Sequence, residues 1–411
     1  MSRFVLDCAV SRAPDEQTAR WATTAMQRAW APVTATYHEG RTSHALLVES
    51  QNAMATLVGG AAAWFVPDVA AAAAHALLDV AVRGGFDVIV TGAADPITLQ
   101  EQSAAAAAQL GLRHEILPVD SAGRLRPGDL PQRALLATAA ANQEIGSVQA
   151  DLGSWAAASG CAVVLDASCA LGWTALPPWW DRLLLDPRAW GSVPGAVAII
   201  SRQAGRPRLS DNVAAAVTCG LTAQQWAQQA GDLRERVRQQ TARIRRRILA
   251  EVADVQVHGG EPGDLPHVLS LSVLYMDAEV LQTRLDTRGY AVGSGSACAS
   301  RTGQASHVLS ATGGLTGGNI RLGLPPGLPD EAVVPGSQVE DETEDDTVHL
   351  VGRPGHREVR VHGPRGVRRV AGQAVQHPLG DVARQVVDPL RRHVHLRRAH
   401  RQEMIAAIRA V

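Results

Sequence analysis

Three short stretches of the sequence carry side chains that could do chemistry together. The stretch YAVGSGSACASRTGQASHVLSATGG, residues 290–314, places Cys298 in a loop rich in glycine and serine. A cysteine thiolate is a strong nucleophile, and small neighbours let it approach a ligand. The same cysteine could instead be one small residue in a turn. Asp166 ends the apolar run VVLD, and Asn142 lies in the turn ANQEIG.

The elements around Asp166 and Asn142 alternate between strand and helix. From about residue 85 to 202, short β-rich runs are separated by stretches rich in Ala, Gln and Leu. This alternation predicts an α/β fold with a mostly parallel sheet covered by helices. In such sheets ligands bind beyond the carboxyl ends of the strands, where Asp166 and the ANQEIG turn are expected. The predicted strands are 87–91, 115–119, 133–137, 162–166, 182–185 and 196–201.

A long helix, about 222–252, is predicted next, with an arginine-rich polar face (RERVRQQTARIRRR) that suits solvent exposure. A smaller α+β unit then carries Cys298. Its predicted strands are 255–258, 268–275 and 320–322, and its predicted helices are 277–288 and 306–312. We therefore expect a large domain over 1–252, whose N-terminal segment packs on the small domain, and a small domain over 253–330.

Composition limits the class of protein. The 411 residues are 46% hydrophobic and 19% charged, with a net charge of −1, which is typical of a globular protein and gives no reason to expect nucleic-acid or membrane binding. Five scattered cysteines form no disulfide framework, and the first residues do not resemble a secretory signal. We expect a cytoplasmic protein. All 39 basic residues are arginine, so no side chain can form a lysine Schiff base.

The last part of the sequence, 331–411, differs in character. Residues 340–346 (EDETEDD) hold six acidic positions in seven, which favours a solvated linker. An Arg/His-rich tail with weak apolar periodicity follows and is expected to be poorly folded. His393, His395 and His400 lie among many arginines, so no metal site is predicted there.

The ordered set of motifs resembles the cysteine desulfurases, class V aminotransferase-like proteins with the pyridoxal 5'-phosphate (PLP)-dependent type I fold. The resemblance covers about residues 4–328. The matching stretches are FVLDCAVSRAPDE, YHEGRTSHALL, ANQEIGSVQ, VVLDASCALG, HVLSLSVLYMDAEVL, GSGSACAS, SHVLSATGGLTGGN and IRLGLP.

This resemblance implies roles for four residues. Cys298 stands where the family has the cysteine that accepts sulfur as a persulfide. Asp166 matches the aspartate that pairs with the pyridinium nitrogen of PLP, and Asn142 matches an asparagine near the ring oxygen. Arg321 matches the arginine that binds the substrate carboxylate through two hydrogen bonds.

Other family positions have changed. The S-x-H-K segment of the family is DPRA here, so Asp186 replaces the serine and Ala189 the cofactor lysine. Asp68 begins the segment that replaces the phosphate-binding G-G-T, Asp95 replaces a ring-stacking histidine, and Cys169 replaces a glutamine. Two carboxylates beside a phosphate dianion are unfavourable by several kcal/mol at about 4–6 Å and an effective dielectric of about 20.

We therefore interpret the chain as a degenerate desulfurase homologue in which PLP is absent or bound only weakly and non-covalently. Its role would be in sulfur transfer, or as a partner or regulator of an active desulfurase. The alternatives are an active cysteine desulfurase with non-covalent PLP, and a decayed protein without function. The resemblance implies a homodimer, or a heterodimer with an active homologue, and a possible sulfur-acceptor protein as partner.

Overall fold

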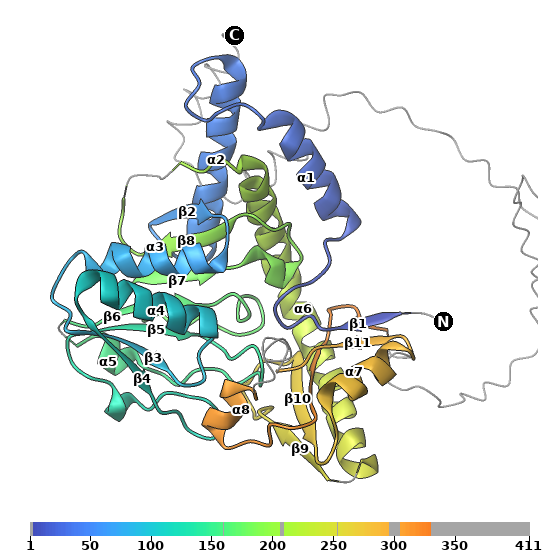
Figure 1. The fold of residues 1–411 in the computed structure, drawn as a ribbon. Coiled ribbons are helices and arrows are strands. Elements are labelled where there is room, and N and C mark those ends of the chain that lie inside the picture. The colour runs from blue at the N-terminus through green and yellow to red at the C-terminus, as the bar shows by residue number, and fades with distance from the viewer. Residues whose placement is uncertain (1–2, 159, 206–208, 253, 296–304, 330–411) are drawn as a thin grey trace, which may run out of the picture.

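A seven-stranded sheet forms the centre of the molecule (Figure 1). The computed structural model describes residues 3–158, 160–205, 209–252, 254–295 and 305–329. The strands run in the order β2-β8-β7-β6-β5-β3-β4, and β8 is antiparallel to both of its neighbours while the other pairs are parallel. Their bounds are β2 Ala62–Val66, β3 Val88–Gly92, β4 Arg113–Leu117, β5 Ala134–Ala139, β6 Ala162–Asp166, β7 Arg182–Leu185 and β8 Val197–Ser201. The six strands predicted from the sequence are all present.

Helices cover both faces of this sheet (Figure 1). Helices α3 (Val69–Ala81) and α4 (Ile97–Leu110) pack on one face, and α2 (His38–Leu57) and α6 (Val213–Glu251) on the other. Successive residues of β6 point into opposite layers: Val163 and Leu165 join the α2/α6 side, and Val164 joins the α3/α4 side. Because both faces are buried, the strands are continuous apolar runs without polar alternation.

Helix α6 begins nine residues earlier than the predicted start at 222. The side chain of Asn212 accepts a hydrogen bond from Ala215 N at 3.2 Å and caps the helix. The first turns, from Val213 to Ala223, are almost entirely buried and pack against α2 and α1 (Glu16–Arg28). A helix that is apolar all round gives no amphipathic periodicity, so the sequence pattern marked only the later, amphipathic part.

A second, three-stranded sheet follows α6, with antiparallel order β12-β10-β9. A separate two-stranded sheet, in which β1 runs parallel to β11, joins the N-terminal segment to this region. The bounds are β1 Phe4–Leu6, β9 Val255–His258, β10 Val268–Val273, α7 Ala278–Asp286, β11 Tyr290–Val292, α8 His307–Thr312 and β12 Asn319–Gly323. The short elements of the large sheet region are η1 Pro127–Asp129, α5 Gly153–Ala156 and η2 Pro187–Trp190. The domain boundaries at 252/253 and 330/331 stay a prediction.

None of the helices in the described part of the chain combines the length and apolar character needed to span a bilayer.

Candidate functional site

The carboxyl ends of four parallel strands bring the predicted site residues to one edge of the large sheet. Asp95 follows β3, Asn142 follows β5, Asp166 ends β6 and Asp186 follows β7. Arg321 approaches the same edge from β12, with its Nη1 3.5 Å from the carbonyl oxygen of Gln143. The predicted placement of Asp166 and the ANQEIG turn at the carboxyl ends of strands is confirmed. Cys298 lies outside the described residues.

Asp95, at the position of the ring-stacking histidine, is a buried carboxylate with structural contacts. It accepts hydrogen bonds from Gly92 N at 2.6 Å, Thr138 Oγ1 at 2.9 Å and Ala139 N at 2.9 Å. Burial raises the pKa of Asp95 to about 6 against these hydrogen bonds, and the nearby charge of Asp166 adds to the rise. This side chain ties the end of β3 to β5 and offers no ring face for stacking.

Ser168 connects the other two carboxylates. Its hydroxyl donates to Asp166 Oδ1 at 2.6 Å and accepts from Asp186 N at 2.8 Å. Burial raises the pKa of Asp166 despite the hydrogen bonds from Ser168, and the charge of Asp186 raises it further. The environment of Asp166 therefore holds a second negative charge, Asp186, that the family pattern does not have.

Arg188 neutralises part of this charge. Its Nε lies 2.9 Å and its Nη2 2.5 Å from Asp186 Oδ2. Hydrogen bonding to Asp186 raises the pKa of Arg188, and the charge of Asp68 contributes in the same direction. Asp68 is the N-cap of α3 and accepts from Ala71 N at 2.8 Å. The structure thus brings Asp68 and Asp186, two positions assigned to phosphate binding by the resemblance, next to one arginine.

The positions of the lysine and the glutamine are also occupied by buried groups. Ala189 is buried in η2, and its carbonyl oxygen accepts from Arg12 Nε at 2.9 Å. Cys169 Sγ donates to Ala141 O at 3.1 Å, and burial raises the pKa of Cys169 to about 12. Neither residue offers an amine or an amide to a ligand.

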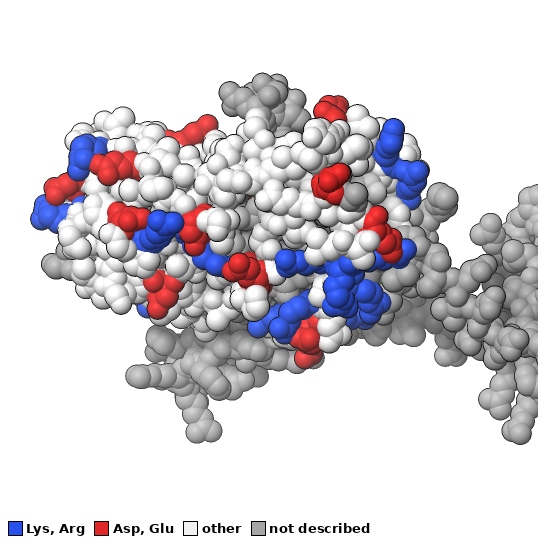
Figure 2. Space-filling view, turned by 90° about the horizontal axis from the view of Figure 1, so that it is seen from below, with Lys and Arg blue, Asp and Glu red and all other residues white. Residues whose placement is uncertain are grey.

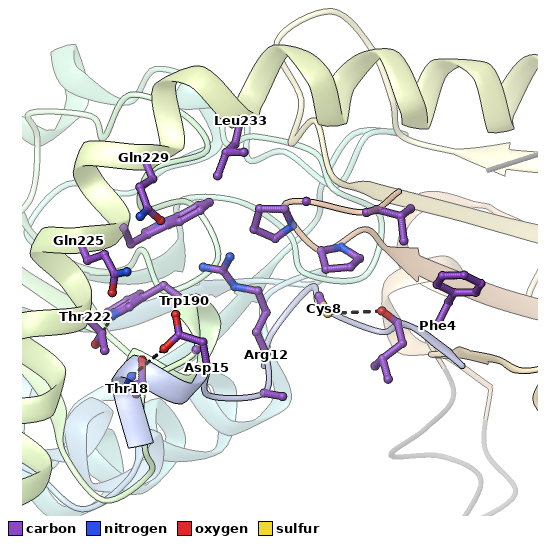
Figure 3. A pocket seen from close by; sticks show the side chains of 18 of the residues that line it. Phe4, Cys8, Arg12, Asp15, Thr18, Trp190, Thr222, Gln225, Gln229 and Leu233 are labelled. Atoms are coloured by element: carbon purple, nitrogen blue, oxygen red, sulfur yellow. Dashed lines mark hydrogen bonds between the residues drawn. The ribbon is translucent and has the colours of Figure 1, made fainter. Parts of the chain in front are cut away.

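Arg12 lies in a cavity of about 550 Å³ next to Ala189 (Figure 3). Its guanidinium carbon lies 4.1 Å from the centre of the Trp226 ring, and burial lowers the pKa of Arg12 to about 10. The N-terminal segment with Cys8 and the middle of α6, from Thr222 to Leu233, form the walls (Figure 3). Figure 3 also shows Asp15 as the cap of α1, with Thr18 N donating to it at 2.7 Å.

Asn142 shapes the turn in which it lies. Its Oδ1 accepts from Glu144 N at 2.8 Å and Ile145 N at 3.0 Å, and its Nδ2 donates to Ala94 O at 2.8 Å. These bonds fold the ANQEIG segment back toward the loop before α4. Asn142 lies at the position that the resemblance assigned, and the hydrogen bonds of its side chain go to the backbone of the protein.

Arg321 is held by a residue that the sequence analysis did not assign. Its Nη2 forms an ion pair with Asp7 Oδ1 at 2.8 Å, and its Nε is buried without a hydrogen-bond partner. Asp7 follows β1 in the matching stretch FVLDCAVSRAPDE, but the sequence analysis assigned no role to this carboxylate. The arginine thus links the N-terminal segment to the second sheet and still has one unused donor.

Both ends of the loop that contains Cys298 lie beside Glu144, a second residue that was missed. Ser306 Oγ donates to Glu144 Oε1, and a Cβ added to Gly295 would lie 1.9 Å from the same oxygen. Burial raises the pKa of Glu144. Gly295 N also donates to Asn319 Oδ1 at 2.8 Å. The described flanks of the loop are therefore fixed at the same sheet edge as Asn142 and Arg321. The turn ANQEIG, which the sequence analysis singled out for Asn142, also contains Glu144.

Among the residues that the structure describes, no group of three or more His, Cys, Asp or Glu side chains is arranged to hold a metal ion.

The arrangement of helices and strands is the α/β fold of the PLP-dependent type I proteins. The chain superimposes on a NifS-like protein with a TM-score of 0.71 at 15% identity, covering 80% of this chain and 96% of that one. A cysteine desulfurase from Thermococcus onnurineus NA1, in its apo form, gives a TM-score of 0.68 at 16% identity over 80% and 92% of the two chains. These identities establish the fold alone.

Sequence similarity points to one group within this fold. The chain is 35% identical over 111 residues to cysteine desulfurase IscS 1 of Archaeoglobus fulgidus, and 35% identical over 82 residues to cysteine desulfurase IscS of Dictyoglomus turgidum. The matches cover 25% and 19% of this chain and 27% and 21% of the relatives, so they span about a quarter of the relatives' length. No family model matches the chain. The resemblance to cysteine desulfurases is confirmed.

Proposed function

We propose that this chain is a desulfurase-like protein that does not use PLP and takes part in sulfur transfer through Cys298. The observation that carries the proposal is the Arg188–Asp186 ion pair, with Asp68 nearby, at the positions that the family uses for phosphate. Ala189 at the lysine position adds to it, since PLP is the cofactor of the cysteine desulfurase family.

The residues present do not fit PLP. A phosphate site needs backbone N–H groups and hydroxyls at a helix N-terminus. Here the first turn of α3 is already capped by the Asp68 carboxylate, and Asp186 contributes a second negative charge. Arg188 can offset only one of them, because its guanidinium is held by Asp186. The site therefore keeps negative charge where a dianion would have to bind.

Sulfur transfer at Cys298 does not require PLP if the sulfur arrives as a persulfide. The Cys298 thiolate attacks the outer sulfur of a donor persulfide, the S–S bond of the donor breaks, and the donor leaves as a thiolate. Cys298 then carries the outer sulfur, without net oxidation or reduction. The donor in this proposal is a partner protein persulfide, such as one on an active homologue bound as a heterodimer in the cytoplasm.

The test is a visible absorption titration with PLP, followed by L-cysteine and a sulfide assay, run beside an active cysteine desulfurase as positive control. We expect no saturable PLP band and no sulfide from this chain. A saturable band together with released sulfide would overturn the proposal.

A second candidate is an active desulfurase that binds PLP non-covalently. The retained Asp166 and the unused, buried Nε of Arg321 favour it, because both residues keep the positions expected for a pyridinium and a carboxylate partner. The same titration separates the two, since only this candidate predicts sulfide that depends on added PLP.

A further inference from the structure

Three arginines of α6 line a cavity of about 570 Å³ on the far side of the helix from the N-terminal segment. Arg234, Arg238 and Arg245 are spaced by four and seven residues, so they share one face of the helix. The opposite wall is the loop from Gly260 to Pro266, with Trp173 beside it. We name this cavity, with its three arginines, the arginine groove. Figure 2 shows a group of basic side chains gathered on the face that is seen from below.

The positive charge of the groove is not balanced by its neighbours. Arg234 Nη2 donates to Gly172 O at 2.9 Å and Arg245 Nη1 to Gly260 O at 2.5 Å, so both guanidiniums are positioned by neutral carbonyls. In the part of the chain that the structure describes, neither has a carboxylate within ion-pair distance, and Nε of Arg234 is buried without a partner. Arg238 pairs only with the exposed Glu235.

The acidic side chains of the loop from Gly260 to Pro266 form their ion pairs with Arg124, outside the groove. Asp264 accepts from Arg124 Nη2 at 2.8 Å and from Val148 N at 3.1 Å, and Glu261 lies 3.4 Å from Arg124 Nη1. The two carboxylates share one arginine, Arg124, so the loop keeps about one net negative charge against the three arginines of α6. Two positioned guanidiniums without a carboxylate partner, together with a third at the surface, make a site for a ligand with several negative charges.

The length of the arginine stripe favours an extended acidic peptide over a compact anion. Arg234 and Arg245 are eleven positions apart, which corresponds to about 16 Å along a helix at about 1.5 Å per residue. A single phosphate cannot contact both ends. About five residues of extended chain cover the same length at about 3.3 Å each.

This chain contains such a segment, 340–346, whose sequence EDETEDD lies outside the described residues. We propose that residues 340–346 bind to the arginine groove of the same molecule. The proposal is independent of the function proposed above. It joins two strongly charged stretches of opposite sign, neither of which the sheet edge uses.

The end of the described chain lies within reach of the groove. Gln240 Nε2, on α6 between Arg238 and Arg245, donates to Leu328 O at 2.8 Å. From residue 328 to residue 340 the chain can extend about 40 Å at about 3.3 Å per residue, while a helix with its side chains is only about 10–12 Å across. A tether of this length keeps the effective concentration of the acidic segment at the groove in the millimolar range.

The experiment uses the full chain with a photo-crosslinking benzoylphenylalanine in place of Thr343, the one uncharged residue of the segment. After irradiation, mass spectrometry maps the crosslinked residues. We expect intramolecular crosslinks to α6 residues 234–245 or to the loop 260–266. Neutralising the groove (Arg234→Gln, Arg238→Gln and Arg245→Gln together) should lower the yield by roughly tenfold, because it removes three ion pairs.

The matched control neutralises three arginines on the other side of the same helix, Arg236→Gln, Arg243→Gln and Arg246→Gln, and should leave the yield unchanged. About 1 M salt, where the Debye length is about 3 Å, should lower the yield of the unaltered protein, which tests the proposal without any groove variant. Crosslinks elsewhere, crosslinks to a second copy of the chain, or a yield insensitive to both salt and the groove substitutions would overturn the proposal.

Discussion

Arg188 and Asp186 form a two-bond ion pair, with Arg188 Nε and Nη2 at 2.9 and 2.5 Å from Asp186 Oδ2. The pair spans only two positions of the chain, in the short turn η2 that also contains Ala189. Asp186 is buried, with 7% of its side chain exposed, whereas Arg188 is half exposed. The buried partner is therefore the acid, and it precedes the same short turn that contains Ala189.

The first prediction concerns the recovery of PLP binding. Ala189→Lys alone should not give a saturable visible band with PLP, because the carboxylates remain. Adding Asp68→Thr and Asp186→Ser to Ala189→Lys should bring PLP affinity up by at least about tenfold, since each carboxylate at about 5 Å opposes a negative charge by about 3 kcal/mol before screening by water. The absorption titration measures both variants. Equal affinity in the single and the triple variant would contradict this explanation.

Six of the seven strands of the large sheet could be predicted because they are short apolar runs between helical stretches, whereas β2 was not predicted. Strands β6 and β7 were bounded correctly, and β3, β4, β5 and β8 to within about two residues. Strand β11 and its pairing with β1 were not predicted. Strands β1 and β11 have three residues each, which is too short for a periodic pattern. Their pairing joins segments almost 290 residues apart in the sequence.

The candidate site was predictable where it depends on position along the chain. Strand ends and motif order were enough to bring Asp95, Asn142, Asp166 and Asp186 to one edge. The contacts that now occupy these side chains were not predictable, because they come from distant segments. Asp7 binds Arg321 across 314 positions of sequence, and no local pattern signals such a pair.

The second prediction tests Cys298 as the sulfur acceptor. Burial raises the pKa of Cys8 to about 11 and that of Cys169 to about 12, and it raises the pKa of Cys219 as well, so these thiols are protonated at neutral pH. When the protein is incubated with a persulfide donor, Cys298→Ser should therefore remove most persulfide labelling.

Cys161 supplies the matched control, because it is a partly exposed free cysteine outside the site. Cys161→Ser should leave most of the labelling in place. Unchanged labelling in Cys298→Ser, read by mass spectrometry of the labelled peptides, would end the sulfur-transfer proposal for this loop.

The third prediction concerns the pH dependence of stability. The pKa of Asp95 is about 6 in the folded protein against an ordinary value of 3.8. The folded state therefore keeps a proton that the unfolded chain releases, so stability falls as the pH rises from about 4 to about 6, by about 3 kcal/mol at about 1.4 kcal/mol per pKa unit. Asp95→Asn should remove this part of the fall, as measured by urea unfolding at pH 4 to 7.

Asp95→Asn should also lower stability at pH 4. In the unaltered protein Gly92 N donates to Asp95 Oδ2, and the amide group of the new asparagine places a second donor against it. Asp129→Asn, a change at an exposed carboxylate, is the control and should leave the slope as it is. A slope in Asp95→Asn equal to that of the unaltered protein would show that Asp95 does not retain the proton.

The fourth prediction concerns the buried ion pair that joins α3 to β7. Arg182 Nε and Nη2 lie 2.8 and 2.5 Å from Asp79 Oδ2, and only 4% of the arginine side chain is exposed. Asp79→Ala leaves the buried guanidinium without its main counter-charge, so it should lower the free energy of unfolding by about 3–5 kcal/mol. Asp79→Leu combined with Arg182→Met should cost less than Asp79→Ala, because no buried charge remains.

The exposed pair Arg133–Asp87 is the matched control, with a distance of 3.0 Å and more than half of each side chain exposed. Asp87→Ala should change the free energy of unfolding by less than about 1 kcal/mol, since water screens and solvates both groups. Urea unfolding of the three variants gives the comparison. If Asp79→Ala and Asp87→Ala cost the same, burial does not determine the strength of the Asp79–Arg182 contact.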